Sequence, residues 1–204
     1  MKIFRSLPLA VVALLFVAAS SRAYDLPAVN LGFTSFLDGA PPAGPGWYWQ
    51  EYQQYYMTDS FKDLSLGGAK PTLDVMVNLS QVVYQSDEEV LRGARWGLDL
   101  IVPYVWFDLN SDGSPLRSNT GLGDVLVGPF LQWDPVMGAN GPLFMQRVEL
   151  QVIVPTGSYE DDKALNPGAN YISIDPYWAG TVFINPQWTA TCRLHYLWND
   201  KNTD

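Results

Sequence analysis

The feature that most constrains this chain is a pair of segments in which every second residue is apolar and a tryptophan stands at each end. The alternate residues read Trp96, Leu98, Leu100, Val102, Tyr104 and Trp106 in one segment, and Trp188, Ala190, Cys192, Leu194, Tyr196 and Trp198 in the other. A period of two places such residues on one face of a β-strand, because successive side chains point to opposite faces. Both segments therefore predict strands with one continuous apolar face.

The distance between the two tryptophans of each row fits a membrane. Ten residues at about 3.3 Å each, tilted by about 40°, rise roughly 25 Å, which is the height of the apolar band of an outer-membrane β-barrel. Aromatic side chains with a polar edge favour the two borders of that band. We therefore predict transmembrane strands whose membrane girdle consists of Trp96, Tyr104, Trp106, Trp188, Tyr196 and Trp198.

Opposite the apolar rows, the predicted strands carry polar and charged side chains. A charge on the lipid face would cost about 2–4 kcal/mol at mid-depth, so we predict that these polar faces line the lumen of a barrel. The polar faces comprise Arg95 and Asp99 in strand 94–108, Arg147, Glu149 and Gln151 in strand 143–155, and Thr189, Thr191, Arg193 and His195 in strand 187–198. In strand 71–84 the same rule assigns Thr72, Asp74, Asn78 and Ser80 to the lumen and Leu73, Val75, Val77 and Leu79 to the lipid.

Alternation of this kind recurs along the chain after residue 46, whereas helical periodicity is hard to find. The predicted strands are 47–57, 71–84, 94–108, 121–133, 143–155, 171–184 and 187–198. The predicted fold class is all-β, an antiparallel up-and-down transmembrane β-barrel. Pro103, Pro129 and Pro176 fall inside predicted strands, where each removes a ladder hydrogen bond, so they imply bulges or misplaced strand ends.

The connections between these strands alternate imperfectly between short and long. Turns are predicted at 134–142 and 185–187. Segment 85–93 should also be a short periplasmic turn, yet it holds three consecutive acidic residues and is not short. The longer connections are polar and rich in Gly, Pro, Asn and Asp, as extracellular loops are, and comprise segments 58–70, 109–120 and 156–170.

The first 23 residues have the pattern of a secretory signal peptide. Lys2 and Arg5 precede an apolar run from 7 to 19, and Ser21 and Ala23 supply small residues at the cleavage positions. The run is shorter than the roughly 20 residues that a transmembrane helix needs. We therefore expect residues 1–23 to be removed on export, followed by a Pro/Gly-rich segment at 24–46 and a partial barrel at 47–204 in the cell outer membrane.

Charge and cysteine content exclude two other classes of protein. The first 23 residues hold three basic residues and no acidic one, so removing them changes the formal net charge from −9 to −12, which argues against a nucleic-acid partner. The single cysteine, Cys192, cannot form an internal disulfide, which excludes a disulfide-stapled secreted domain. Its place in an apolar row predicts a buried or lipid-facing thiol.

Several longer motifs resemble one protein family. They are residues 25–32, 35–47 and 50–56 near the start, GLGDVLVGPFLQW at 121–133 and RLHYLWND at 193–200. These motifs are similar to the meta-pathway phenol-degradation family of outer-membrane β-barrel proteins. The resemblance implies a barrel of about twelve strands, an even number as in other bacterial barrels, that helps aromatic or other hydrophobic compounds reach degradative enzymes. Because the sequence ends in the loop-like residues 199–204, we expect that the chain lacks the C-terminal portion of such a barrel.

Motifs for catalysis or metal binding are weak. Asp108, Asn110 and Asp112 match the first half of a calcium-binding loop, but Asn119 stands where a bidentate Glu belongs, so we interpret the segment as a solvated turn. His195 is the one histidine of the sequence, and we interpret it as a hydrogen-bonded lumen residue rather than a catalytic base. No hydrolase, metalloprotease, phosphate-loop or CxxC motif occurs. We therefore expect no enzyme activity, cofactor or bound metal.

The strongest functional candidates are the charged lumen residues Arg95, Asp99, Asp124, Arg147, Glu149, Arg193 and His195. They either pair with one another to fill a narrow barrel or form a polar wall that steers a phenol-like solute. A second set of residues could stack on an aromatic ligand, although the girdle is their favoured assignment, and comprises Tyr48, Tyr52, Tyr55 and Tyr56.

The predicted function is a channel or uptake barrel for small hydrophobic or aromatic compounds, with outer-membrane lipid as its surroundings. Two alternatives stay open. One is a barrel that only anchors, adheres or stabilises the envelope, and the other is a secreted soluble β-sandwich that binds a small ligand. The sequence leaves the solute, the pore size and the oligomeric state open.

Overall fold

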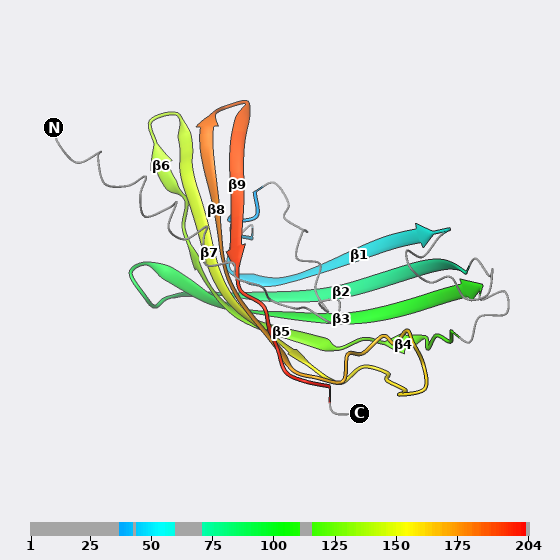
Figure 1. Cartoon of the computed structure of the whole chain (residues 1–204). Coiled ribbons are helices and arrows are strands. Elements are labelled where there is room, and N and C mark those ends of the chain that lie inside the picture. The colour runs from blue at the N-terminus through cyan, green and yellow to red at the C-terminus, as the bar shows by residue number, and fades with distance from the viewer. Residues whose placement is uncertain (1–36, 43, 60–70, 111–115, 203–204) are drawn as a thin grey trace, which may run out of the picture.

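In the computed structural model of the chain, the structure describes residues 37–42, 44–59, 71–110 and 116–202. These residues form one antiparallel sheet that curls into a half-barrel (Figure 1). Within the same residues there is no helix of the length and hydropathy that crossing a bilayer requires. The predicted signal peptide at 1–23 lies outside the described residues, as does most of the predicted segment 24–46.

The sheet is built from strand segments that follow one another in chain order. They are β1 (Gly46–Thr58), β2 (Thr72–Glu89), β3 (Ala94–Asn110), β4 (Gly121–Leu122), β5 (Val125–Trp133), β6 (Val136–Gly138), β7 (Gly141–Val154), β8 (Ser173–Asn185), β9 (Trp188–His195) and β10 (Trp198–Asn199). The strand order is β1-β2-β3-β5-β7-β8-β10, with β4 paired to β3, β6 to β7 and β9 to β8. Because β4 and β6 continue the line of β5, and β9 leads into β10, the described strands occupy seven positions. The predicted all-β, antiparallel, up-and-down arrangement and its seven strands are confirmed.

The connections sort by length to the two ends of the sheet, which we call the turn end and the loop end. The turn end carries residues 90–93, 139–140 and 186–187. At the loop end the strands lie further apart in the sequence: β1 ends at Thr58 and β2 begins at Thr72, β3 ends at Asn110 and β4 begins at Gly121, and β7 ends at Val154 and β8 begins at Ser173. The alternation is more regular than the sequence suggested, since two connections were drawn too long. β2 continues through the acidic residues to Glu89, and the segment predicted as a turn at 134–142 contains β6. Strand pairing overrides the polar composition at both places.

The three prolines predicted to disturb the ladder lie where it is interrupted. Opposite Pro103, three steps along β3 from Ile101 to Tyr104 correspond to four steps from Leu126 to Leu122, which is a bulge. The ladder between β5 and β7 has no pair at Pro129. At Pro176 the carbonyl accepts a hydrogen bond of 3.1 Å from the backbone N–H of Tyr196, in the two-residue break between β9 and β10.

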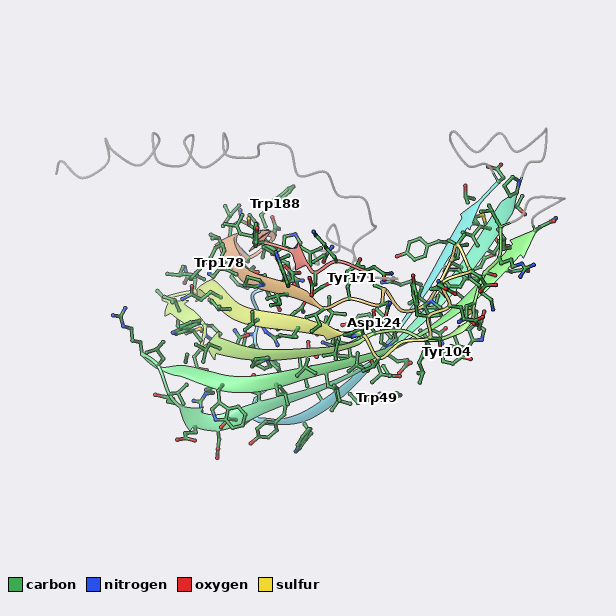
Figure 2. The ribbon with its side chains drawn as sticks, turned by 60° about the horizontal axis from the view of Figure 1, so that its bottom comes forward. Trp49, Tyr104, Asp124, Tyr171, Trp178 and Trp188 are labelled. Atoms are coloured by element: carbon green, nitrogen blue, oxygen red, sulfur yellow. The ribbon has the colours of Figure 1, made fainter. Side chains whose placement is uncertain are left out.

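The convex face of the sheet is rich in exposed apolar side chains, whereas the concave face is largely buried on β5, β7 and β8. The tryptophan-bounded rows of β3 and of β9 with β10 lie on the convex side, as the sequence predicted. Figure 2 labels one residue of each row, Tyr104 and Trp188. All six predicted girdle residues share this face. Cys192 lies in the same row and is exposed. The large exposed side chains of the row on β9 and β10 are Trp188, Leu194, Tyr196 and Trp198.

One predicted assignment of faces is wrong. In β2, Gln81 donates to Asp99 of β3 across the concave face, so the residues that share its parity, from Leu73 to Leu79, are concave as well. The predicted lumen residues Thr72, Asp74, Asn78 and Ser80 lie on the convex face, in register with the tryptophan row of β3. The concave residues of β2 are aliphatic from Leu73 to Leu79 and become polar at Gln81, so polarity alone does not identify the enclosed face of this strand. The alternation in β2 separated the two sets of side chains correctly, but the prediction placed the polar set in the lumen and the apolar set against lipid, which is the reverse of the structure.

Candidate functional site

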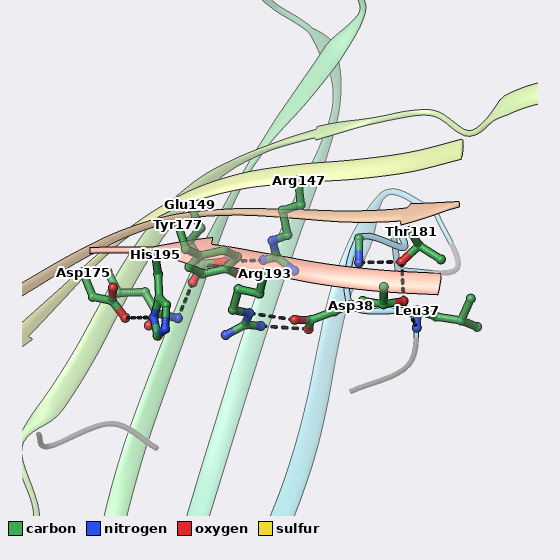
Figure 3. Close-up of polar contacts among 12 residues, drawn as sticks. Leu37, Asp38, Arg147, Glu149, Asp175, Tyr177, Thr181, Arg193 and His195 are labelled. Atoms are coloured by element: carbon green, nitrogen blue, oxygen red, sulfur yellow. Dashed lines mark hydrogen bonds and ion pairs between the residues drawn. The ribbon is translucent and has the colours of Figure 1, made fainter. Parts of the chain in front are cut away.

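Five of the seven predicted lumen residues share the concave face of β3, β7 and β9. The register sets Glu149 of β7 opposite Phe130 of β5 on one side and Tyr177 of β8 on the other. Tyr177 in turn faces His195 of β9. Because each strand contributes every second residue, side chains from distant parts of the sequence meet on one wall (Figure 3). The five are Asp99, Arg147, Glu149, Arg193 and His195.

Glu149 is the centre of this wall and is 1% exposed. The hydroxyl of Tyr177 donates to its Oε2 at 2.6 Å, and the side-chain amide of Gln151 donates to Oε1 at 2.8 Å. Arg147 forms an ion pair with Oε2 at 2.9 Å. The guanidinium of Arg147 also lies 3.7 Å from the centre of the Phe130 ring. A buried carboxylate needs such partners, because burying an unpaired charge is costly.

Two glycines make room for these side chains on the sheet. A Cβ added at Gly128 would collide with the carboxylate of Glu149, and one at Gly97 would collide with the ring of Phe130. Both glycines lie in strands, where glycine otherwise weakens the fold and often marks a close approach. Gly97 and Gly128 therefore allow the charged wall to lie flat against β3 and β5.

Arg193 ties the wall to the segment that precedes β1. Its Nε donates to Asp38 Oδ2 at 2.6 Å and its Nη2 to Asp38 Oδ1 at 2.8 Å, a two-point contact between the guanidinium and the carboxylate. The same guanidinium lies 4.2 Å from the centre of the Tyr177 ring. Arg193 thus connects the network around Glu149 with residues near the beginning of the chain.

Residues 37–40 are bound to the concave face by backbone contacts as well. The N–H of Leu37 donates to Thr191 at 3.1 Å and that of Gly39 to Thr181 at 3.3 Å, while Gln132 donates to the carbonyl of Gly39 at 3.1 Å. A Cβ at Gly39 would lie 2.8 Å from the carbonyl oxygen of Met145, so this close approach requires glycine. The segment therefore occupies part of the space that the half-barrel encloses (Figure 3).

Asp99 and His195 extend the wall on either side. The side-chain amide of Gln81 donates to Asp99 Oδ2 at 2.6 Å. His195 Nδ1 lies 3.4 Å from Asp175 Oδ2, a long contact that is ionic only if the imidazole is protonated. Both pairs place a carboxylate that is at most 3% exposed on the concave face.

Two predicted lumen residues do not join this network. Arg95 lies at the turn end, where it donates to the carbonyl of Asp87 at 2.6 Å and lies 3.4 Å from Asp134. Asp124 lies in the bulge between β4 and β5 and accepts the backbone N–H groups of Gly157 at 2.9 Å and Ala169 at 2.7 Å. Arg95 therefore stabilises the turn end of the sheet near Asp87 and Asp134, and Asp124 stabilises the loop between β7 and β8.

Sequence reasoning missed three members of the wall. Asp175 and Tyr177 belong to β8, whose alternate residues Ser173, Asp175, Tyr177, Ala179 and Thr181 form a polar parity that the pattern contained. Asp38 was missed because its segment, residues 24–46, was interpreted from its Pro/Gly content alone. The feature that could have indicated a role is that Asp38 is an acidic residue in an almost uncharged stretch. The predicted stacking tyrosines also divide, since Tyr48, Tyr52 and Tyr56 share the concave parity of β1 and Tyr55 is convex.

A second part of the concave face is apolar. It lies toward the loop end of β2 and β3, where Val75 faces Phe107, Val77 faces Val105 and Leu73 faces Leu109. Val105 is buried, and the others are partly exposed. We call this set, together with Leu79, the apolar patch. The wall of the half-barrel is therefore charged around Glu149 and apolar at the loop end of β2 and β3.

No group of three His, Cys, Asp or Glu side chains suited to a metal ion occurs among the residues that the structure describes. In the predicted calcium-like loop, Asp108 and Asn110 are the last part of β3, and Asp112 lies outside the described residues. Within 37–42, 44–59, 71–110 and 116–202 the arrangement consists of ion pairs and hydrogen bonds along a wall rather than a nucleophile beside a base.

The fold is similar to that of a solved outer membrane channel from Pseudomonas putida F1. The two structures superpose with a TM-score of 0.65 at 21% sequence identity, over 81% of this chain and 60% of the channel. This chain thus spans about 60% of the length of the channel that it matches. A search of the curated proteins gives no match.

A family model matches residues 58–204, which includes β2 to β10 and every charged member of the wall except Asp38. This is most of the sequence, and it contains the later motifs on which the resemblance was based. The chain belongs to the family described as "Putative MetA-pathway of phenol degradation".

Proposed function

We propose that this chain forms the wall of an outer-membrane β-barrel that admits small hydrophobic or aromatic compounds. Family membership and the likeness to a solved outer membrane channel support the cellular location. The arrangement of short turns at one end and long loops at the other is the one that outer-membrane barrels adopt, with the turns in the periplasm. No catalytic residue and no cofactor are part of the proposal.

The observation that carries the proposal is the opposite chemistry of the two faces of β9. Thr191, Arg193 and His195 contact other polar groups on the concave face, while Trp188 and Leu194 are exposed on the convex face. A water-soluble half-barrel would gain nothing from exposed aromatic residues at both ends of such a row. A bilayer stabilises that pattern, because its apolar core contacts the row and its borders favour tryptophan and tyrosine.

The concave face supports a solute with an apolar part, such as an aromatic ring, better than it supports a sugar. The apolar patch offers Val75, Val77 and Phe107 as contacts for a ring or an alkyl chain. The charges around Glu149 are paired with one another, so they present few free groups to a polar solute. Residues 37–40 lie over the same wall, held by the ion pair of Asp38 with Arg193. We infer a resting state in which this segment narrows the passage.

Permeation through liposomes tests the proposal. The protein is refolded into liposomes and tested with an aromatic acid that is ionised at neutral pH, and with a sugar of similar size. We expect faster entry of the aromatic acid than of the sugar, and faster than into liposomes that hold a barrel without a channel. Entry equal to that control would instead favour a barrel that anchors or stabilises the envelope.

Fractionation tests the location separately. An outer-membrane barrel remains in the envelope fraction and changes its gel migration on heating, since boiling unfolds it. A folded monomer in the periplasm or the medium without detergent would favour the soluble binding protein.

A further inference from the structure

One region of the convex face does not have the chemistry of a lipid-facing wall. Glu51 and Gln53 of β1 pair directly with Ser80 and Asn78 of β2, and all four side chains are convex. We call this group the polar square. The hydroxyl of Ser80 lies 3.0 Å from each carboxylate oxygen of Glu51. Elsewhere the convex parities of β3, β5, β8 and β9 are almost wholly apolar through the middle of the strands.

The polar square lies between aromatic residues on its own strand, so it does not lie beyond the border of the membrane. Trp47 and Trp49 precede it on β1 with 73% and 69% of their surface exposed, and Tyr55 follows it at 59%. Trp47 also contacts Tyr84 of β2, whose ring contacts Trp96 of β3, which makes one aromatic row across three strands. By the rise of a tilted strand, Glu51 lies about 10 Å from both Trp47 and Tyr55 along the barrel axis.

A carboxylate and two amides at that depth are poorly suited to hydrocarbon, because lipid tails cannot accept or donate hydrogen bonds. In a bilayer such groups are found facing protein or water, and polar contacts between neighbouring proteins then hold them together. Since the square is on the convex side, the barrel's own lumen cannot serve it.

We propose that the polar square is an interface with a second copy of this chain in the membrane, an inference that rests on the proposed outer-membrane location. The square can satisfy itself across a two-fold axis: the amides of Gln53 and Asn78 donate, and the carboxylate of Glu51 accepts. The described strands supply no Lys or Arg on this face, so amides and hydroxyls are the donors that the carboxylate can find in a second copy. The flanking Trp49, Tyr55 and Met76 add large apolar surface that can pack against the same surface of the other copy.

Cross-linking in outer-membrane fractions tests the interface. The full-length variant Gln53→Cys with Cys192→Ser places its one described cysteine in the square, and the unmodified protein serves as the matched control. Cys192 is exposed on the convex face of β9, away from β1. We expect a short bis-maleimide to give a species of twice the monomer mass from Gln53→Cys and not from Cys192.

A second variant keeps the proposal falsifiable without relying on cross-linking. Glu51→Leu, Gln53→Leu, Asn78→Leu and Ser80→Val together make the square apolar, which suits lipid and leaves the concave face intact. We expect the dissociation constant of the dimer in lipid, measured by energy transfer on dilution, to rise at least about tenfold.

Three results would overturn the proposal while the protein remains heat-modifiable and in the envelope. They are no cross-link from Gln53→Cys, equal cross-linking from both positions, and a cross-link to a different envelope protein. A dimer that is unchanged by the apolar variant would also overturn it. Loss of the envelope location itself would remove the proposed function first, and fractionation detects that outcome independently.

Discussion

The region around β7 to β9 and the region around β1 and β2 use the same alternation in opposite ways. In β7 to β9 the concave residues are charged and paired, as with Glu149 and Arg193, and the convex residues are apolar. In β1 and the loop-end half of β2 the concave residues of β2 are aliphatic, and the convex residues include Glu51 and Asn78. Both regions belong to one continuous sheet.

The difference teaches that alternation reports two faces, not which of them is enclosed. Where an enclosed face is charged, its side chains satisfy one another and fix the wall. Where an enclosed face is apolar, it remains open to a hydrophobic solute, and the polar face on the other side needs a partner. The reversed region therefore carries the proposed contacts with the solute and the proposed interface with a second copy. The regular region carries the proposed membrane location and supports the wall.

The largest expected effect is the difference in free energy of unfolding between replacing the buried carboxylate of Glu149 and replacing the convex carboxylate of Glu51. Glu149→Ala removes the partner of Arg147 and leaves a buried cation, which should lower the free energy of unfolding by about 3–5 kcal/mol. Glu51→Ala removes a convex carboxylate at membrane depth and leaves no buried charge behind, so it should not lower this free energy. Urea titration of the refolded barrel, followed by its heat-modifiable band, gives both values. Equal costs would mean that burial does not distinguish the two regions.

The anchor of residues 37–40 should have the next largest effect. Asp38→Ala removes a two-point ion pair with Arg193 and should cost about 1.5–3 kcal/mol of stability. Release of the segment should also increase the entry of small solutes into liposomes. Asp162→Ala breaks an exposed ion pair with Arg117 at the loop end and is the control, with an expected change below about 1 kcal/mol. Unchanged permeation of Asp38→Ala would contradict the inferred narrowing by this segment.

Glycine substitution tests how closely the charged wall lies against the sheet. Gly128→Ala places a methyl group against the carboxylate of Glu149, so we expect a loss of about 1–3 kcal/mol from overpacking. Ala190→Val adds bulk on the convex face of β9 and should change stability by no more than about 0.5 kcal/mol. The same urea titration compares them. A tolerated Gly128→Ala would show that Glu149 can take another position.

The smallest expected effect concerns the apolar patch. Val77→Asn changes a concave residue, and Val82→Asn changes a convex residue of the same strand. Losing the burial of one aliphatic side chain corresponds to about 1.5 kcal/mol, so aromatic-acid entry should fall about tenfold in Val77→Asn. Entry of the sugar should stay the same. Val82→Asn places an amide on the lipid-facing side and is the control for strand stability, so its aromatic-acid entry, normalised to folded heat-modifiable protein, should stay the same. A similar loss in both variants would mean that strand stability, not contact with the solute, was changed.

Much of the fold was accessible from the sequence because the strand period and the turn residues are local properties. The rows from Trp96 to Trp106 and from Trp188 to Trp198 gave strand identity, length and a common face. The strand ends were less accessible. Glu89 and Val136 belong to strands because they pair with a neighbouring strand, although their surroundings are rich in polar or turn-forming residues.

The candidate site was accessible in part. Arg147, Glu149, Arg193 and His195 could be placed on one face, since each lies in a long strand with clear alternation. Their partners could not be named, because the pairing of Glu149 with Tyr177 depends on the register between strands. The contact of Asp38 with Arg193 spans 155 residues and joins a segment without periodicity to a strand, so no local pattern encodes it.

The most direct test of the account is the accessibility of Cys192 and its neighbour in a bilayer. A nitroxide on Cys192 reports the convex face of β9, and one on Arg193→Cys in a Cys192→Ser background reports the concave face. In nanodiscs, we predict that oxygen, which concentrates in lipid, relaxes the label at 192, and that a water-soluble nickel complex relaxes the label at 193. Strong nickel access at 192 would show that the apolar row faces water, and the outer-membrane barrel would then be wrong.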